Sequence, residues 1–147
     1  MSTATEITKT NNFLHTDYDV SKIFVFSNRY EKATLLNASG VVASFLPGTL
    51  MGRIAASGKI VPLESAAVDG SQYPVGVLKT MVTDLAIAGE IEVNVCIAGD
   101  VVENKIILDG SDTLETIIEL KRIKDRIKSD TMGIQLVGSA ELTGTDN

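Results

Sequence analysis

The stretch EIEVNVCIA, from Glu90 to Ala98, decides the fold class. Apolar side chains at Ile91, Val93, Val95 and Ile97 alternate with Glu90, Glu92, Asn94 and Cys96. A period of two predicts a β-strand with one face buried and the other exposed to solvent. The next residues, Ala98-Gly99-Asp100, have the chemistry of a turn, so we expect Val101–Leu108 to return antiparallel as the second strand of a hairpin.

Short β-rich runs continue this pattern over most of the chain. They are separated by Gly, Pro, Asn and Asp, with turns at Pro47-Gly48 and Asp69-Gly70. The runs are Lys22–Ser27, Ala33–Asn37, Thr49–Ile54, Lys59–Leu63, Val75–Met81, Glu90–Ala98 and Val101–Leu108. Such spacing is typical of a mostly-β domain.

The pattern changes after Ser111, where DTLETIIELKRIKDRIK contains neither Gly nor Pro. We expect one C-terminal helix over about 112–129, with Asp112 as N-cap and Glu115 completing a capping box. Basic residues load its C-terminal half favourably against the helix dipole. Ile134–Val137 is expected to form a last short strand. The predicted fold class is therefore mainly β with one C-terminal helix, an α+β arrangement.

The two ends of the chain have a different character. Residues 1–21 are rich in Thr and Asn, and their apolar residues follow no period of 2 or 3.6. Such a segment buries too little apolar surface to offset its ordering entropy, so we interpret it as an arm, flexible until it lies on a partner. We therefore divide the chain into the arm at 1–21, a β-rich domain at 22–138 and a loose tail at 139–147.

Composition limits the function classes. The chain has 147 residues, 44% of them hydrophobic and 22% charged, which suits one domain with its own core. The 13 basic and 19 acidic residues give a net charge of -6, which is unfavourable for direct binding to nucleic acid. One cysteine forms no internal disulfide, so the chain can fold in a reducing cytoplasm. No apolar stretch is long enough to cross a membrane, and no signal-peptide pattern opens the chain.

Candidate catalytic residues are few. The chain has one histidine, His15, which lies in the expected arm. A single histidine rules out a multi-histidine metal site. Cys96 has no basic neighbour in sequence to activate it, so we interpret it as a packed or interface residue. Glu90 and Glu92 share a strand face, but such pairs are usually the polar side of an alternating strand. Nothing assembles a nucleophile, a base and an orienting group, so we expect no enzyme, no cofactor and no metal.

Three further motifs have ordinary structural explanations. Gly48–Arg53 lacks the Gly-Lys-Ser/Thr ending of a phosphate loop. Asp109–Asp112 resembles part of a calcium loop, but a turn followed by a helix cap explains it. The basic residues of Lys121–Lys128 lie among acidic ones that make Asp112–Asp130 neutral, which favours a solvated helix face with ion pairs.

Four stretches resemble the phage head decoration proteins related to protein D of phage lambda. ATLLNASG (Ala33–Gly40) followed by LPGTLMGRI (Leu46–Ile54) resembles the opening strands of that family. DGSQYPVGVL (Asp69–Leu78) and the strands of Gly89–Leu108 extend the similarity. The resemblance implies a small β-barrel or β-tulip-like domain without catalytic residues. It also implies a homotrimer on local threefold positions of the phage capsid.

In a protein of that family the arm would make the attachment. An extended arm adds a strand to an exposed sheet edge with little demand on its sequence, and its apolar residues act as anchors. The anchors we expect to bind the major capsid protein are Phe13, Leu14, Tyr18 and Val20. Three arms on one trimer would act together through effective concentration. The protein would be made in the host cytoplasm and would stabilise the outer surface of the expanded head against DNA pressure.

Two alternatives from other classes stay open at this point. A trimeric β-barrel nucleotide hydrolase has a similar length, although the Asp- and Arg-containing loops of a dUTP-hydrolysing enzyme are not recognisable here. A receptor- or glycan-binding β module of a tail or fibre usually exposes aromatic residues, whereas aromatics are 5% of this chain and tryptophan is absent.

Overall fold

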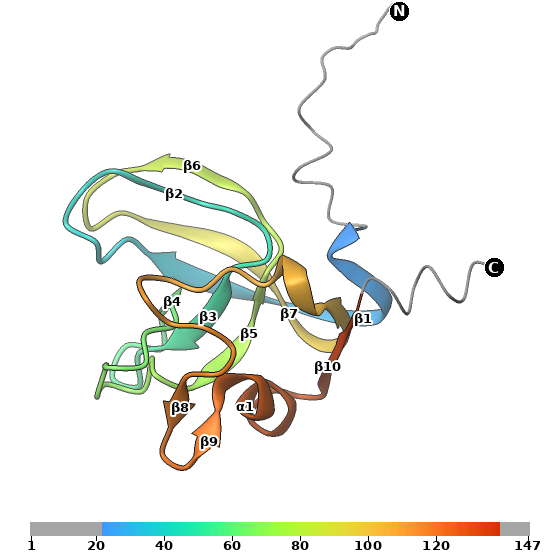
Figure 1. Ribbon diagram of the computed structural model, residues 1–147. Helices are drawn as coiled ribbons and strands as arrows, with labels where there is room; N and C mark the ends of the chain where they lie inside the picture. The colour runs from blue at the N-terminus through green and yellow to red at the C-terminus, as the bar shows by residue number, and fades with distance from the viewer. Residues whose placement is uncertain (1–21, 139–147) are drawn as a thin grey trace, which may run out of the picture.

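A computed structural model describes residues 22–138 of the chain. Five strands form a closed β-barrel in the order β1, β4, β3, β5, β7, and pairing between β7 and β1 completes the ring (Figure 1). The barrel strands are β1 (Phe24–Leu36), β3 (Leu50–Arg53), β4 (Ile60–Pro62), β5 (Pro74–Leu78) and β7 (Glu90–Val102). The predicted mostly-β fold with one helix is confirmed.

The remaining elements lie around the barrel. The strands β2 (Ala43–Phe45) and β6 (Val82–Leu85) form a two-stranded sheet, and β10 (Ile134–Val137) pairs in parallel with the end of β7. A short hairpin of β8 (Ile117–Ile118) and β9 (Lys121–Arg122) leads directly into the helix α1 (Ile123–Asp130). The 3-10 helix η3 (Glu103–Lys105) follows β7.

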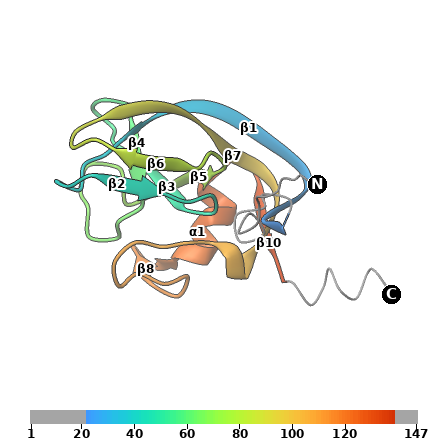
Figure 2. The same ribbon diagram turned by 90° about the horizontal axis from the view of Figure 1, so that it is seen from above.

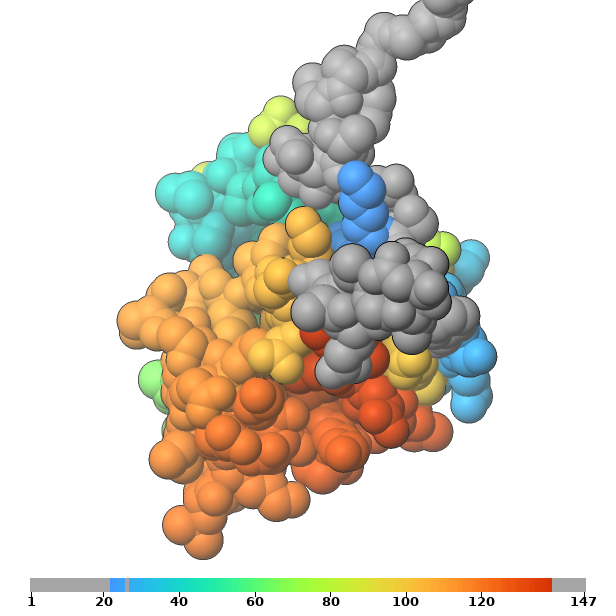
Figure 3. Space-filling view, turned by 45° about the vertical axis from the view of Figure 1, so that its right-hand side comes forward, coloured from blue at the N-terminus to red at the C-terminus, as the bar shows by residue number. Residues whose placement is uncertain are grey.

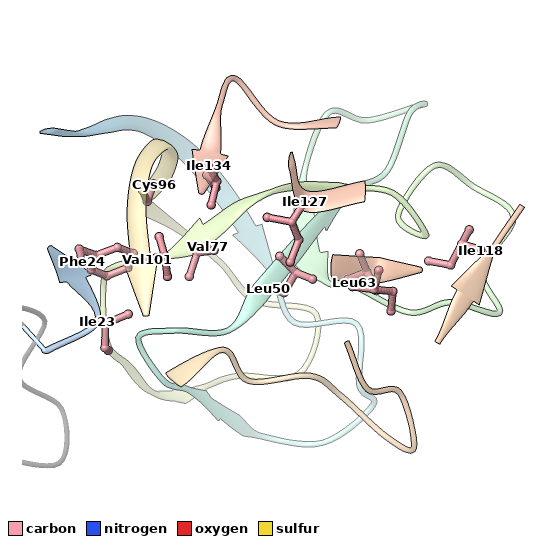
Figure 4. Packing of buried hydrophobic residues seen from close by; sticks show 11 residues of the cluster. Ile23, Phe24, Leu50, Leu63, Val77, Cys96, Val101, Ile118, Ile127 and Ile134 are labelled. Carbon is pink, nitrogen blue, oxygen red and sulfur yellow. The ribbon is translucent and has the colours of Figure 1, made fainter. Parts of the chain in front are cut away.

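Alternation along the strands builds two cores on opposite sides of the barrel wall. The barrel core consists of Leu35, Phe45, Met51, Ile60, Leu78, Val82, Val93 and Val95. The helix-side core consists of Ile23, Phe24, Leu50, Leu63, Val77, Cys96, Val101, Ile118, Ile123, Ile127 and Ile134 (Figure 4). Neighbours such as Leu50 and Met51 point into different cores, as the period of a strand requires.

The helix α1 therefore covers the outside of the barrel, where it contacts β5 and β10 (Figure 2). Its buried residues, Ile123 and Ile127, are four positions apart and occupy one face of the helix. Cys96, expected opposite the apolar face of its strand, is fully buried because α1 and β10 cover that side of β7. Ile91, expected inside, is 42% exposed because it lies near the start of β7.

The expected hairpin after Ala98 is wrong. The strand β7 continues through Gly99, whose φ is +109°, and ends at Val102. Glycine allows the strand to bend there, where the pairing of β1 with β7 also shifts register. Partners on both edges extend the strand, since Val101 pairs with Phe24 of β1 and with Leu136 of β10. β1 is likewise one strand rather than the two expected runs.

The expected helix over about 112–129 is also wrong in its first half, since α1 begins at Ile123. Asp112 is no helix cap: its carboxylate accepts hydrogen bonds from the backbone N–H and the hydroxyl of Ser65, at 2.9 and 2.6 Å. Ile118 is buried in the helix-side core while Ile117 is 67% exposed, an alternation that suits a strand. Tertiary packing thus overrides the helical propensity of this segment.

Candidate functional site

The four expected anchors, Phe13, Leu14, Tyr18 and Val20, lie outside the described residues. The structure does show where the two ends of the described chain lie. The backbone N–H of Val102 donates to the Ile23 carbonyl at 2.8 Å, and Val137 pairs with Val102 on the other side. The two ends of the described chain, residues 22 and 138, therefore adjoin strands that both pair with the end of β7.

Cys96 is a packed residue. Its sulfur accepts from Asn28 Nδ2 at 3.6 Å and donates to the Ala98 carbonyl at 3.2 Å. Burial raises the pKa of the Cys96 thiol, so the unreactive protonated form is favoured. His15, the one histidine of the chain, lies outside the described residues.

The carboxylates of Glu90 and Glu92 do not form an acid–base pair. Glu90 binds Lys59 at 2.5 Å, and Glu92 lies 3.9 Å from Lys32. Each carboxylate thus has its own cation on the surface. Within residues 22–138, no group of three or more His, Cys, Asp or Glu residues is arranged to hold a metal ion. No helix in the same range is long and apolar enough to cross a membrane.

The basic segment at Lys121–Lys128 is largely neutralised by carboxylates. Arg122 binds Glu115 at 2.9 Å and Asp125 at 3.0 Å, contacts that raise the pKa of Arg122 and lower that of Asp125. Arg126 binds Asp130 at 3.0 Å. The ion-paired solvated face expected from the sequence is present, although half of it lies on the hairpin. Gly48–Arg53 runs into β3 and forms no phosphate loop.

An apolar patch lies at one tip of the barrel and is organised by Asn37, which is only 1% exposed. The Asn37 side-chain amide donates to the carbonyls of Val41, Leu85 and Ala86 at 2.7, 3.0 and 3.1 Å. These bonds join the loop after β1 to the loop after β6. The joined loops expose Val41, Val42 and Ile87, at 61%, 55% and 59%.

A groove of about 550 Å³ opens beside β2 and β4. Its apolar lining includes Phe45, Leu46, Val61, Pro62 and Ile107, and its carboxylates are Glu64, Asp69 and Asp109. Hydrogen bonds from the hydroxyl and backbone N–H of Ser71 lower the pKa of Asp69, so the groove keeps this negative charge. The groove can accept an apolar group that is accompanied by a positive charge.

The β8–β9 hairpin presents a third apolar feature, Leu120, which is 97% exposed. Figure 3 shows that the orange segment containing this hairpin reaches the lower extremity of the molecule. Sequence reasoning missed Leu120 and the role of Asn37. Neither has a local signal: Glu119-Leu120 contains no turn-forming residue, and Asn37 is recognisable as a buried hub only when both loops are in place.

The described part of the chain is a closed β-barrel with two buried cores and exposed apolar loops, which defines a small β-barrel protein. The sequence model of the bacteriophage lambda head decoration protein D family matches residues 26–116. The chain belongs to this family of phage head structural proteins, as the resemblance indicated. A search of curated proteins gave no match. The matched range ends one residue before β8.

Proposed function

We propose that this protein is a cementing protein that binds as trimers at local threefold positions on the outer surface of the expanded phage head. It contacts the major capsid protein there and stabilises the shell against the pressure of packed DNA. The observation that carries the proposal is the family match over residues 26–116, which covers the barrel except for the first two residues of β1. The match favours this function over a nucleotide hydrolase or a glycan-binding module.

Two physical features support placement on the shell. The net charge of -6 has the same sign as DNA, which disfavours a position against the packaged genome. Both ends of the described chain leave from strands that flank Val102, so residues 1–21 and 139–147 can reach the same underlying surface. The barrel end at Val102 therefore faces the capsid in this proposal.

The arm supplies the attachment. Phe13, Leu14, Tyr18 and Val20 are the apolar anchors, and the intervening backbone adds a strand to a sheet edge of the capsid protein. One arm makes a modest contact, but three arms on one trimer bind together, so that the attachment is strengthened by effective concentration.

The test is sedimentation of purified protein with expanded, undecorated heads. We expect saturable binding at the number of threefold positions. Changing Phe13, Leu14, Tyr18 and Val20 together to Ser should weaken capture at least tenfold. A matched control changes the exposed Met81 and Met132, which lie on the described domain, to Ser and should retain binding. Full-length protein that stays in the supernatant contradicts the proposal, whereas unchanged capture of the arm variant contradicts only the arm mechanism.

A further inference from the structure

The backbone of the β8–β9 hairpin is strained at its tip. The two central residues, Glu119 and Leu120, have φ of +48° and +75°. A two-residue hairpin turn of this kind normally takes Asn or Gly, because other side chains disfavour positive φ. Leu120 gains nothing from burial in its own chain, since its side chain is 97% exposed. Strain that displays an apolar side chain to solvent points to a functional contact.

Other residues hold this strained tip in place. Arg126 of α1 donates from Nε to the Ile118 carbonyl at 2.7 Å and from Nη2 to the Glu119 carbonyl at 3.1 Å. The Arg126 guanidinium also lies 5.1 Å from the ring centre of Tyr73, whose hydroxyl donates to the Glu119 carboxylate. That hydrogen bond raises the pKa of Tyr73. The hairpin is thus preorganised, which reduces the entropy lost when Leu120 binds a partner.

The charges around Leu120 match those of the groove described above. Lys121, the next residue, forms no ion pair with a carboxylate of residues 22–138, and its ammonium donates to the Ser129 hydroxyl at 3.3 Å. The groove carries Glu64 and Asp69 beside apolar side chains, and neither carboxylate forms an ion pair within the described range. None of residues 115–122 lines the groove, so knob and groove are separate surfaces of one chain.

We propose that Leu120 of one copy inserts into this groove of a second copy, with Lys121 directed at the groove carboxylates. Each copy then gives one knob and receives one, a head-to-tail contact that closes into a ring when the rotation between copies permits. The inference rests on the trimer proposed above and names the surfaces that join its subunits. The hairpin lies outside the range that the family model matches.

Cysteine cross-linking tests the contact directly. One preparation carries Leu120→Cys and the other carries Cys at a groove position, in turn Ile107, Ala67 and Ser44. The native Cys96 is fully buried and does not compete. On mild oxidation we expect disulfide-linked dimers in the mixture but not in either preparation alone, and linked trimers from a chain that carries both cysteines. The background is the cross-linking of Leu120→Cys with Met132→Cys, an exposed position outside the groove. Cross-linking that does not exceed this background at any of the three groove positions overturns the inference.

A second variant separates stability from association. Changing Leu120 to Gly supplies the residue that this turn position prefers and keeps the Glu119 carboxylate that accepts from Tyr73, so the melting temperature should rise. The same change removes the knob, so self-association measured by sedimentation velocity should weaken at least tenfold. Met132→Ser, at an exposed position that does not line the groove, is the matched control, and its association should be unchanged. A variant that is more stable and associates normally contradicts the docking role.

The outcomes distinguish this inference from the proposed function. The cross-linking is repeated in the presence of expanded heads. Binding to heads without the knob-to-groove disulfide overturns the inference and leaves the cementing function in place. A disulfide that forms without binding to heads overturns the cementing function and leaves the contact between copies in place. If neither the disulfide nor binding to heads is observed, the contact and the cementing function are both overturned.

Discussion

Gly76 of β5 lies directly against the backbone of Cys96 in β7: a Cβ atom built on Gly76 would be 2.5 Å from the Cys96 carbonyl oxygen. The same atom would be 2.4 Å from Val95 Cγ1. Real Cβ atoms do not approach other atoms so closely. Because β5 and β7 are neighbours in the barrel wall, the absence of a side chain at position 76 is a condition for closing the barrel.

Gly76→Ala should therefore separate β5 from β7. We expect the free energy of unfolding to fall by about 2 to 3 kcal/mol, the cost of overpacking a close contact. The control is Gly58→Ala, at a position with φ of +75° and open space around it, where the loss is about 1 kcal/mol. Urea unfolding measures both. Equal losses in the two variants would contradict the close-approach argument.

The hub at Asn37 gives a second prediction. Asn37→Asp replaces an amide donor with a carboxylate that faces the carbonyls of Val41, Leu85 and Ala86, all of which need a donor. We expect a loss of about 3 kcal/mol in the free energy of unfolding, because a buried carboxylate cannot donate to these carbonyls and its negative charge faces their oxygens. Hydrogen exchange should become faster at the backbone N–H groups of Ala88 and Gly89.

Ser39→Ala is the control for the hub. It removes one hydroxyl that donates to Asn37 Oδ1 but keeps the backbone N–H of Ser39 that donates to the same oxygen. The expected loss is about 1 kcal/mol. An Asp variant as stable as this control would show that Asn37 does not join the two loops.

The ionisation of Asp69 gives a pH-dependent prediction. Hydrogen bonds from Ser71 lower the pKa of Asp69 in the folded protein below its value in the unfolded chain. Such a group stabilises the fold at pH values above its unfolded pKa, and that contribution is lost as the pH falls through the folded pKa. Ser71→Ala removes the hydroxyl but keeps the backbone N–H. The Asp69 pKa, followed by carboxyl NMR, should therefore rise, and an unchanged value would refute this cause.

Cys96 should react with thiol reagents only when the barrel opens. Its side chain is fully buried, and burial raises the pKa of its thiol. We expect labelling to be slow in native buffer and fast in denaturing urea, with a native rate that increases in Gly76→Ala. Rapid labelling of the native protein would show that α1 and β10 open readily from this side of β7.

Local patterns were sufficient for part of the fold. The alternation in Glu90–Ala98 predicts the strand correctly, and Ile134–Val137 forms a strand with the expected bounds. Strand residues carry their signal within a few positions, which is why these segments can be recognised alone. The family resemblance rests on similarly short motifs, and the family match confirms it.

Long-range contacts explain what the sequence did not reveal. Residues 112–122 have helical composition, but Ile118 is buried beside Leu63 and Asp112 binds Ser65. Both partners are distant in sequence, so no local pattern contains them. Gly99 suggested a turn, yet two neighbouring strands pair with β7 there and keep it extended. The exposed Leu120 follows from the same hairpin and was therefore missed as well.

A cryo-electron microscopy map of mature heads tests the central claim most directly. We predict three copies of the barrel around each local threefold axis on the outside of the shell, with the Val102 end toward the capsid protein. Density for residues 1–21 should lie along a strand of that protein. Heads that contain the chain at other positions, or that lack it on their outer surface, would contradict the account.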